Sequence, residues 1–394
     1  MEKTIKDFFL QFKPLDAQDK EILQHAKEYF KEENINELSQ LLRQKKMKCS
    51  LVPFTLSNQV FEHTAPFPTF EATTNDPDII SYIAEANQTL QTKLFKNIYP
   101  RFAANAWKVF PKLIAPNIIG HDIIKKAVAL QLFAVEPIHI LLLGDPAIGK
   151  TDIIRSASEL HPIATYGLGS GMSGVGLAVT LIGDEVEPGL LPLADQGICC
   201  LDELNLLKEE SRGSLYNAME KGFITYDKKG KHLRFDARVR VLATANPLGD
   251  KFTGKTIAEL KKQIPFDDAL LSRFHLTFLT RKPDTAQFLQ ITDAILKQKN
   301  VELTKTDIFF LKSYICHAEQ LTVTLPEVYH QDIVAFASEL KKKEGKALFE
   351  ISPRLVIGIV RLAQARARLS LRIKVIQEDI EEVKKIIERA MEIV

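Results

Sequence analysis

The middle of the chain alternates short, continuously apolar runs with longer amphipathic segments. Three such runs are HILLLG, QGICCLDE and VRVLATANP, at residues 139–144, 196–203 and 239–247. Each run is short and has no polar face, which is typical of a strand buried within a parallel sheet. A helical pattern begins at Lys150, directly after the first run. Strands that alternate with helices predict an α/β fold in which helices cover both faces of a parallel sheet.

The flanking regions have a helical pattern instead. We expect a small, mainly helical region at 1–95, the α/β core at 96–283 and a second helical region at 284–394, where no further strand-like run occurs. Residues 43–48, RQKKMK, could contact phosphate, although a solvated helix end is the more ordinary interpretation. Residues 50–75 are irregular or extended and could hold a strand pair.

The composition is that of a folded protein with more than one domain. Of 394 residues, 45% are hydrophobic and 26% are charged, and the net charge of +2 means that any surface for nucleic acid must be local. The four cysteines form no CxxC pair and the histidines do not accompany them at zinc spacing, so we expect neither disulfides nor zinc. No signal-peptide core or membrane-length apolar run occurs. We therefore expect a cytoplasmic protein without a membrane partner, associated with the nucleoid if it is prokaryotic.

Residues 144–151, GDPAIGKT, fit the phosphate-loop pattern GxxxxGK[ST] and lie between a predicted strand and a predicted helix. In such a loop, backbone N–H groups and the helix N-terminus face the phosphates. Lys150 would neutralise the β- and γ-phosphates, and Thr151 would offer its hydroxyl to Mg²⁺. A glycine turn with an exposed lysine is the alternative, but it does not explain a full motif in this context. We expect ATP and Mg²⁺ to bind at Gly144, Asp145, Pro146, Ala147, Ile148, Gly149, Lys150 and Thr151.

Polar side chains also end the other two apolar runs. Asp202 and Glu203 follow the second run, and Asn246 follows the third. The carboxyl ends of parallel strands share one edge, where such sheets bind ligands. Asp202 would hold Mg²⁺ through water, Glu203 would orient or deprotonate the attacking water, and Asn246 could bond the γ-phosphate. Each of these features is common alone, so their order after a phosphate loop is what favours a catalytic site.

The motifs GDPAIGKT, GLGSGMSGVGLAV, ADQGICCLDELNLL, NAMEKG, ARVRVLATANP and LLSRFHLTF, in this order, resemble the AAA+ ATPase module of the minichromosome maintenance (MCM) replicative helicases. ISPRLVIGIVRLAQARARLSLR, followed by VIQEDIEEVKKII, resembles the family's helical lid. The resemblance covers about residues 110–394. It implies an α/β AAA+ P-loop ATPase core with a C-terminal helical lid, preceded here by the small, mainly helical region.

The resemblance implies roles for two arginines. Arg273 in LLSRF would be an arginine finger that reaches the ATP of a neighbouring subunit, and Arg354 in SPRL would be a sensor-2 arginine on the γ-phosphate. Without the resemblance, Arg273 is a surface arginine, and Arg354 is a helix-start arginine that pairs with an acid. Both roles require a homo-oligomeric ring, expected to be a hexamer, because a second chain completes each ATP site.

Two insertions also match the family. GSGMSGVGLAV, residues 169–179, resembles its helix-2 insert, and residues 222–235 resemble its presensor-1 hairpin. The residues alone predict a hairpin there, with a turn at Gly230 and lysines at the tip. In the family a lysine at this tip touches DNA; a solvated charged turn is the alternative. The candidate DNA contacts are Lys228, Lys229 and Lys231.

The chain also departs from the family pattern. Members usually carry a large N-terminal domain with an oligonucleotide-binding barrel and a cysteine-ligated zinc site, whereas about 95 to 110 residues without zinc cysteines precede the module here. Asn205 stands where an acid is common. The sequence predicts an ATP-dependent, ring-forming translocase or helicase that acts on single-stranded or forked DNA. The alternative is an MCM-like AAA+ ATPase that remodels or regulates protein partners without unwinding DNA.

Overall fold

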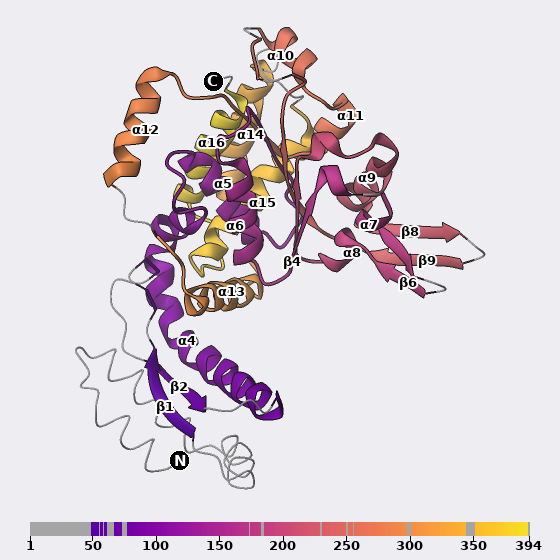
Figure 1. The fold of residues 1–394 in the computed structure, drawn as a ribbon. Coiled ribbons are helices and arrows are strands. Elements are labelled where there is room, and N and C mark those ends of the chain that lie inside the picture. The colour runs from indigo at the N-terminus through magenta and orange to yellow at the C-terminus, as the bar shows by residue number, and fades with distance from the viewer. Residues whose placement is uncertain are drawn as a thin grey trace. The chain divides into compact units, whose positions relative to one another are not determined.

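The computed structural model describes residues 49–392 except for residues 55, 58, 61–66, 73–76, 173, 183–184, 229–230, 250, 255, 298–300 and 344–350. The described chain divides into two units (Figure 1). The first contains the residues up to Asn105 together with Leu303–Tyr314, and the second contains Ala106–Glu302 and Ile315–Val394. The three-part division at residues 95 and 283 stays a prediction.

The first unit contains a strand hairpin and parts of two helices. β1 (Cys49–Phe54) and β2 (Phe67–Ala72) form an antiparallel pair, which the sequence leaves open. The helical parts belong to α4 (Pro77–Leu113) and α13 (Lys305–Glu319). Aromatic rings pack these helices together, with 4.7 Å between the ring centroids of Phe102 and Tyr314. The helices expected before residue 48, and with them residues 43–48, lie outside the described residues.

The second unit is built around a five-stranded parallel sheet with the strand order β11–β3–β10–β7–β4. The three predicted strands are present and lie in the centre of this sheet, which confirms the α/β fold (Figure 1). Two edge strands were not predicted, because their sequences ATYGL and LTFLT mix polar residues and glycine with apolar ones. The strands are β3 (Ile140–Gly144), β4 (Ala164–Leu168), β7 (Ile198–Asp202), β10 (Arg240–Ala245) and β11 (Leu276–Thr280).

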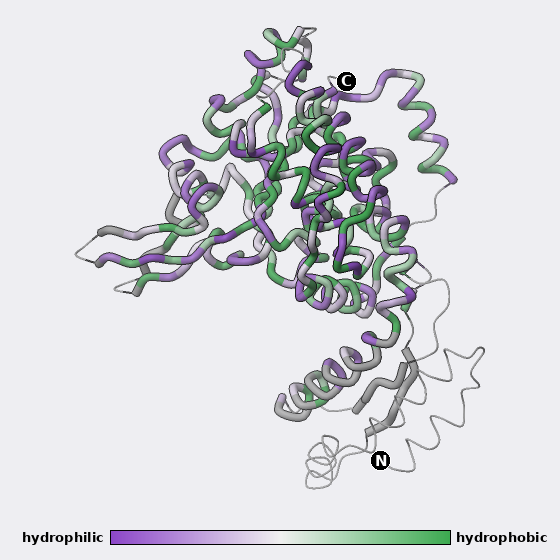
Figure 2. The backbone as a smooth tube through the Cα atoms, turned by 180° about the vertical axis from the view of Figure 1, so that it is seen from behind, coloured by the Kyte–Doolittle hydropathy of each residue, from purple (hydrophilic) through white to green (hydrophobic). Residues whose placement is uncertain are grey.

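Both faces of the central strands are buried. Figure 2 shows the hydropathy along the backbone, with hydrophobic segments in the interior of this unit. On one face, side chains of β3, β7 and β10 pack with those of α9 (Arg212–Lys221). α6 (Lys150–Leu160) also contacts β4, β7 and β10. Burial raises the pKa of the Cys199 thiol to about 12 and also raises that of Cys200, so both side chains remain small and apolar. Because both faces are covered, the three runs lack the alternation of a half-exposed strand.

Two strand pairs extend from this unit (Figure 1). β8 (Phe223–Lys228) and β9 (Lys231–Asp236) form the predicted hairpin. The helix-2 insert contains a short 3-10 turn, η1 (Gly169–Gly171), and α7 (Gly174–Leu177). It leads into an antiparallel pair that was not predicted, β5 (Val179–Ile182) with β6 (Glu185–Pro188).

The C-terminal part of the described chain is helical, as predicted. In addition to α13, its helices are α12 (Thr285–Lys297), α14 (His330–Lys342), α15 (Pro353–Leu369) and α16 (Gln377–Met391). The other helices of the unit are α5 (Asp122–Leu132), α8 (Leu190–Leu193), α10 (Ile257–Gln263) and α11 (Asp268–Leu271), with the 3-10 turns η2 (Leu204–Leu206), η3 (Glu209–Ser211) and η4 (Glu327–Tyr329). Within the described ranges, no helix combines the length and apolar character needed to cross a membrane.

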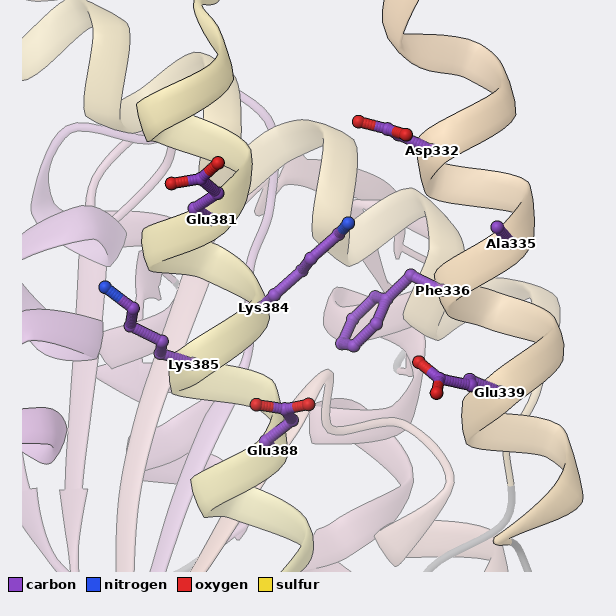
Figure 3. Close-up of a pocket in the computed structure, with 8 residues that line it drawn as sticks. All are labelled: Asp332, Ala335, Phe336, Glu339, Glu381, Lys384, Lys385 and Glu388. Carbon is purple, nitrogen blue, oxygen red and sulfur yellow. The ribbon is translucent and has the colours of Figure 1, made fainter.

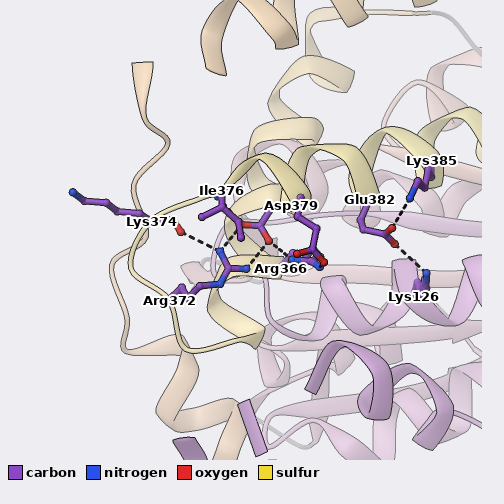
Figure 4. A network of polar contacts seen from close by, with 9 residues as sticks. Lys126, Arg366, Arg372, Lys374, Ile376, Asp379, Glu382 and Lys385 are labelled. Carbon is purple, nitrogen blue, oxygen red and sulfur yellow. Dashed lines mark hydrogen bonds and ion pairs between the residues drawn. The ribbon is translucent and has the colours of Figure 1, made fainter. Parts of the chain in front are cut away.

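A buried ion network joins α15 and α16 (Figure 4). Asp379 of α16 is fully buried and accepts hydrogen bonds from Arg366 of α15 and from both Nη atoms of Arg372, at 2.6 and 2.7 Å. Glu382, one turn along α16, pairs with Lys126 of α5 at 3.0 Å. This second pair fixes α16 to α5, the helix that precedes β3.

An open groove of about 500 Å³ lies between α14 and α16 (Figure 3). Phe336 and Lys384 point toward one another in it, with the Lys384 Nζ 5.4 Å from the ring centroid. Its remaining lining is mostly acidic, and none of the sequence-predicted site residues lines it. The groove is therefore separate from the candidate site described next.

Candidate nucleotide-binding site

The loop between β3 and α6 has the backbone geometry of an anion-binding nest. Ala147 and Gly149 have positive φ angles of 64° and 83°. Successive N–H groups in such a conformation converge on one point, and Gly149 caps a helix whose first N–H groups have no intrahelical partner. His121 supports the loop from behind, with its Nε2 3.0 Å from the carbonyl oxygen of Ile148. A strained Ala147 is the kind of conformation that persists at ligand clamps.

The side chain of Lys150 is folded into this loop. Its Nζ donates to the carbonyl oxygens of Gly144 at 2.8 Å and Asp145 at 2.6 Å. Burial lowers the pKa of Lys150 from its ordinary 10.5 to about 8, although nearby carboxylates including Asp202 favour the charged form. The loop therefore offers one largely desolvated ammonium group where the motif places the phosphates.

The side chain of Asp145 has a structural role that differs from the roles of the other residues in the motif. Its buried carboxylate accepts hydrogen bonds from the backbone N–H groups of Phe252, at 2.7 Å, and Lys282, at 2.9 Å. These residues follow β10 and β11 in the chain. The side chain of Asp145 therefore anchors the loop to two neighbouring segments, and its oxygens are already in use.

Asp202 ends β7 and is only 2% exposed. Thr244 on β10 donates to its Oδ1, and Tyr166 on β4 donates to its Oδ2 at 2.8 Å. The Thr244 hydroxyl also accepts from the N–H of Glu203 at 2.9 Å. Thr244 could have been found from the sequence, because it is a polar residue inside an apolar run. Tyr166 could not, because β4 itself was not predicted.

Glu203 and Asn246 complete this edge of the sheet. Glu203 is half-buried and has a left-handed backbone, with φ 53° and ψ 48°. The N–H of Asn246 donates to the side-chain oxygen of Asn205 at 3.0 Å, so an amide here supplies the acceptor that an acid would supply. β3, β10 and β7 are adjacent and parallel in the sheet, so their carboxyl ends lie side by side. The structure therefore brings together Lys150, Asp202, Glu203 and Asn246 at the carboxyl ends of these strands.

The two arginines lie near the amino end of β11, at the opposite end of the strands from the nucleotide site. β11 runs from Leu276, beside Ile140, to Thr280, beside Gly144, so its length of about 13 Å separates Arg273 from the phosphate loop. Arg354 donates to the carbonyl oxygen of Ser272 at 2.8 Å and therefore lies beside Arg273. Burial, and then the nearby Arg273, lower the pKa of Arg354.

Arg273 has partners on its own chain. Its Nη2 donates to Glu220 at 2.9 Å, its Nη1 donates to the carbonyl oxygen of Ala269, and its Cζ lies 4.6 Å from the Tyr216 ring centroid. Glu220 is itself half exposed, with 51% of its side chain accessible. The sequence alone did not predict these contacts.

The three candidate DNA-contact lysines belong to the hairpin tip. Lys228 and Lys231 form the last register pair of β8 and β9, and Lys229 lies outside the described residues. Nearer the base, the guanidinium of Arg234 lies 3.9 Å from the ring centroid of Phe223, with 63% of the Arg234 side chain exposed. The basic character of the hairpin thus extends below its tip.

These residues fit a nucleotide with Mg²⁺. Mg²⁺ in nucleotide sites takes oxygen ligands, usually one or two carboxylates together with substrate phosphates. Asp202 supplies a buried carboxylate at the edge that bears the anion nest, and Thr151 follows Lys150 at the start of α6. Among the described residues, no three His, Cys, Asp or Glu side chains cluster as a metal site. The absence of zinc stays a prediction.

Known protein families match most of this chain. The MCM P-loop domain matches residues 95–299, and the MCM AAA-lid domain matches residues 309–391. The first match contains the phosphate loop, Asp202, Asn246 and Arg273, and the second contains Arg354. The two matches together include the sheet and the lid helices of the second unit.

Curated relatives agree with these matches. The DNA replication licensing factor mcm7 of Xenopus tropicalis is 33% identical over 301 residues, which are 70% of this chain and 42% of that protein. The minichromosome maintenance protein MCM of Saccharolobus solfataricus is 31% identical over 293 residues, 68% of this chain and 42% of that protein. The chain thus spans about two fifths of the length of the relatives it matches. With a P-loop domain over half of its length and an AAA-lid domain behind it, the chain belongs to the MCM family.

Proposed function

We propose that the chain is a subunit of an ATP-driven, ring-forming DNA translocase or helicase. One observation carries the proposal: the nucleotide-site residues and the two arginines lie at opposite ends of the strands of the same sheet. An arginine at the far end is too distant for its own phosphate loop but is available to the loop of a second copy. A closed ring is the arrangement in which every copy can both give and receive such an arginine.

In this proposal, each side chain at the edge has a separate task. Lys150 and the loop N–H groups hold the phosphates, and Asp202 and Thr151 hold Mg²⁺, which neutralises charge that develops on the phosphates. Glu203 orients the attacking water and accepts its proton, while Asn246 keeps that water and the γ-phosphate aligned. Arg273 and Arg354 of the neighbouring copy stabilise the transition-state charge.

The hairpin supplies the contact with DNA. In a six-membered ring it would project toward a central channel, where Lys228, Lys229 and Lys231 would contact backbone phosphates. Such contacts are independent of base sequence, as a translocating enzyme requires. β10 ends at the nucleotide site, and its amino end follows the hairpin by four residues, from Asp236 to Arg240. Movement at the nucleotide site could therefore reach the hairpin through one strand.

The test measures ATP hydrolysis with and without single-stranded and forked DNA, followed by strand separation on the fork. We expect DNA to stimulate hydrolysis, and Glu203→Gln to bind ATP while hydrolysing it at least about 100-fold more slowly. Glu187→Gln, an exposed acid on β6, is the matched control and should hydrolyse ATP like the parent chain. Hydrolysis that ignores DNA would contradict the translocase proposal and favour an ATPase that remodels protein partners.

A further inference from the structure

The hydroxyl of Tyr166 lies between a cation and the carboxylate of Asp202. Tyr166 stands on β4 beside Cys200 of β7, which places its ring next to the end of β7. Its Oη donates to Asp202 Oδ2 at 2.8 Å and accepts a hydrogen bond from Nε of Arg155 at 3.3 Å. Arg155 belongs to α6, the helix that begins at the phosphate loop. One phenol group thus connects that helix to the buried acid.

We propose that Tyr166 is a positioning residue for Asp202 and thereby sets how tightly the chain holds Mg²⁺ together with a nucleotide. The inference rests on the proposed function, because it assigns the metal to Asp202. It adds a residue from an edge strand that the site's motifs do not include.

The geometry gives the mechanism. A carboxylate offers about four lone-pair positions, and Thr244 and Tyr166 each occupy one on a different oxygen. Two donors on opposite oxygens fix the plane of the carboxylate and leave two lone pairs for metal-bound water. Without the Tyr166 hydroxyl, Oδ2 of Asp202 loses its donor, and only the bond from Thr244 to Oδ1 still orients the carboxylate plane. Partners that orient a metal-binding carboxylate in this way typically change metal affinity by about 10–100-fold when removed.

The hydrogen-bond geometry makes the hydroxyl a donor to Asp202. Its oxygen accepts from the Nε of Arg155, so its own proton is directed at Oδ2 of Asp202. The hydrogen bond from Arg155 also polarises the phenol and strengthens its own bond to Asp202.

The test is Tyr166→Phe in the full chain. The first readout is the affinity for a non-hydrolysable ATP analogue, measured by calorimetry with Mg²⁺ and with EDTA. We expect unchanged affinity in EDTA and an about tenfold smaller gain from Mg²⁺ than in the parent chain. The second readout is hydrolysis, in which the Mg²⁺ concentration for half-maximal rate should rise about tenfold while the rate at saturating Mg²⁺ stays within about threefold.

Tyr226→Phe is the matched control. Its hydroxyl is buried and has no hydrogen-bond partner among the described residues, so its removal should leave both readouts at the parent values. Arg155→Ala, at an exposed position, is the second variant and guards against a Tyr166→Phe chain that fails to fold. It leaves Tyr166 in place but removes the polarising donor. We expect the gain from Mg²⁺ to be about two- to fivefold smaller, which is about half of the Tyr166→Phe effect on a logarithmic scale.

The outcomes separate the two proposals. A parent chain whose nucleotide affinity does not respond to Mg²⁺ would overturn both the proposed function and this inference. A parent chain that responds, together with Tyr166→Phe and Arg155→Ala chains that respond equally, would overturn the inference alone. An equal loss of affinity in EDTA and in Mg²⁺ would also overturn it, because that is the result of general damage to the site.

Discussion

Mixing two inactive variants tests whether neighbouring chains share each ATP site. Lys150→Ala removes the phosphate-loop ammonium but keeps Arg273, and Arg273→Ala keeps the loop but removes the finger. Arg273, the proposed finger, lies about 13 Å of strand away from its own loop, beyond the reach of a side chain. Each variant alone should therefore be inactive, with Arg273→Ala slower by about 10³–10⁵-fold if the arginine acts as fingers do elsewhere.

The expected recovery follows from counting interfaces. In a random ring made from equal amounts of both chains, an active interface needs the intact loop of an Arg273→Ala chain and the intact finger of a Lys150→Ala chain. About one quarter of the interfaces meet this condition. If interfaces act independently, the mixture should recover up to about one quarter of the parent rate, and the recovery should be greatest at equal amounts.

The assay is steady-state ATP hydrolysis across mixing ratios, with co-assembly of differently tagged chains checked by size-exclusion chromatography. A chain carrying both substitutions, mixed with Arg273→Ala, is the control, because no interface then contains a finger. No recovery at any ratio, in mixtures that demonstrably co-assemble, would refute shared sites. Recovery in the control would show that the rate comes from something other than Arg273.

Three further results are expected. Because burial lowers the pKa of Lys150 to about 8, its charge is lost as pH rises through that value; ATP affinity measured by calorimetry should fall above pH 8 by up to about tenfold per unit, and a flat profile to pH 9.5 would contradict this. Glu319→Ala leaves Arg240, whose side chain is 2% exposed, without its carboxylate partner, so chemical denaturation should show a free energy of unfolding lower by about 3 kcal/mol. Glu392→Ala, which breaks a more exposed ion pair, should lower it by at most about 1 kcal/mol. Alanine at all three hairpin lysines should weaken DNA binding and lower its salt slope by about 0.7–0.9 per lost phosphate contact, with basal hydrolysis unchanged; an unaltered slope would mean that these lysines are solvated.

The parts of the fold that the sequence predicted are those encoded locally. The phosphate loop needs only eight consecutive residues in the right context. β3, β7 and β10 are buried on both faces, so each is a largely apolar run, interrupted in β10 by Arg240 and Thr244. β4 and β11 lie at the sheet edges, and their sequences, which mix polar and apolar residues, were not recognised as strands. The strand pair β5–β6 is equally short and was missed for the same reason.

Contacts across the sheet could not be predicted, because they depend on strand order. Tyr166 meets Asp202 only because β4 lies next to β7, and nothing in either segment specifies that neighbour. Arg240 shows the same limit inside a correctly predicted strand. Its buried guanidinium is paired with Glu319, which lies 79 residues away along the chain. In the sequence, Arg240 is only an arginine within an apolar run.

The present contacts of Arg273 are weak enough to be exchanged for a phosphate. Its ion pair with the half-exposed Glu220 contributes at most about 1 kcal/mol, and its position over Tyr216 contributes about 0.5–1 kcal/mol. A finger that accelerates hydrolysis by about 10³–10⁵-fold stabilises the transition state by about 4–7 kcal/mol. The gain therefore exceeds the loss if both of these contacts break while the hydrogen bond to the carbonyl oxygen of Ala269 is kept. The ring of Tyr216 can also stay beneath the guanidinium while Glu220 is released, since an aromatic face and a phosphate approach the cation from different directions. Arg273 is thus held in place on its own chain without being bound so firmly that a neighbouring nucleotide could not recruit it.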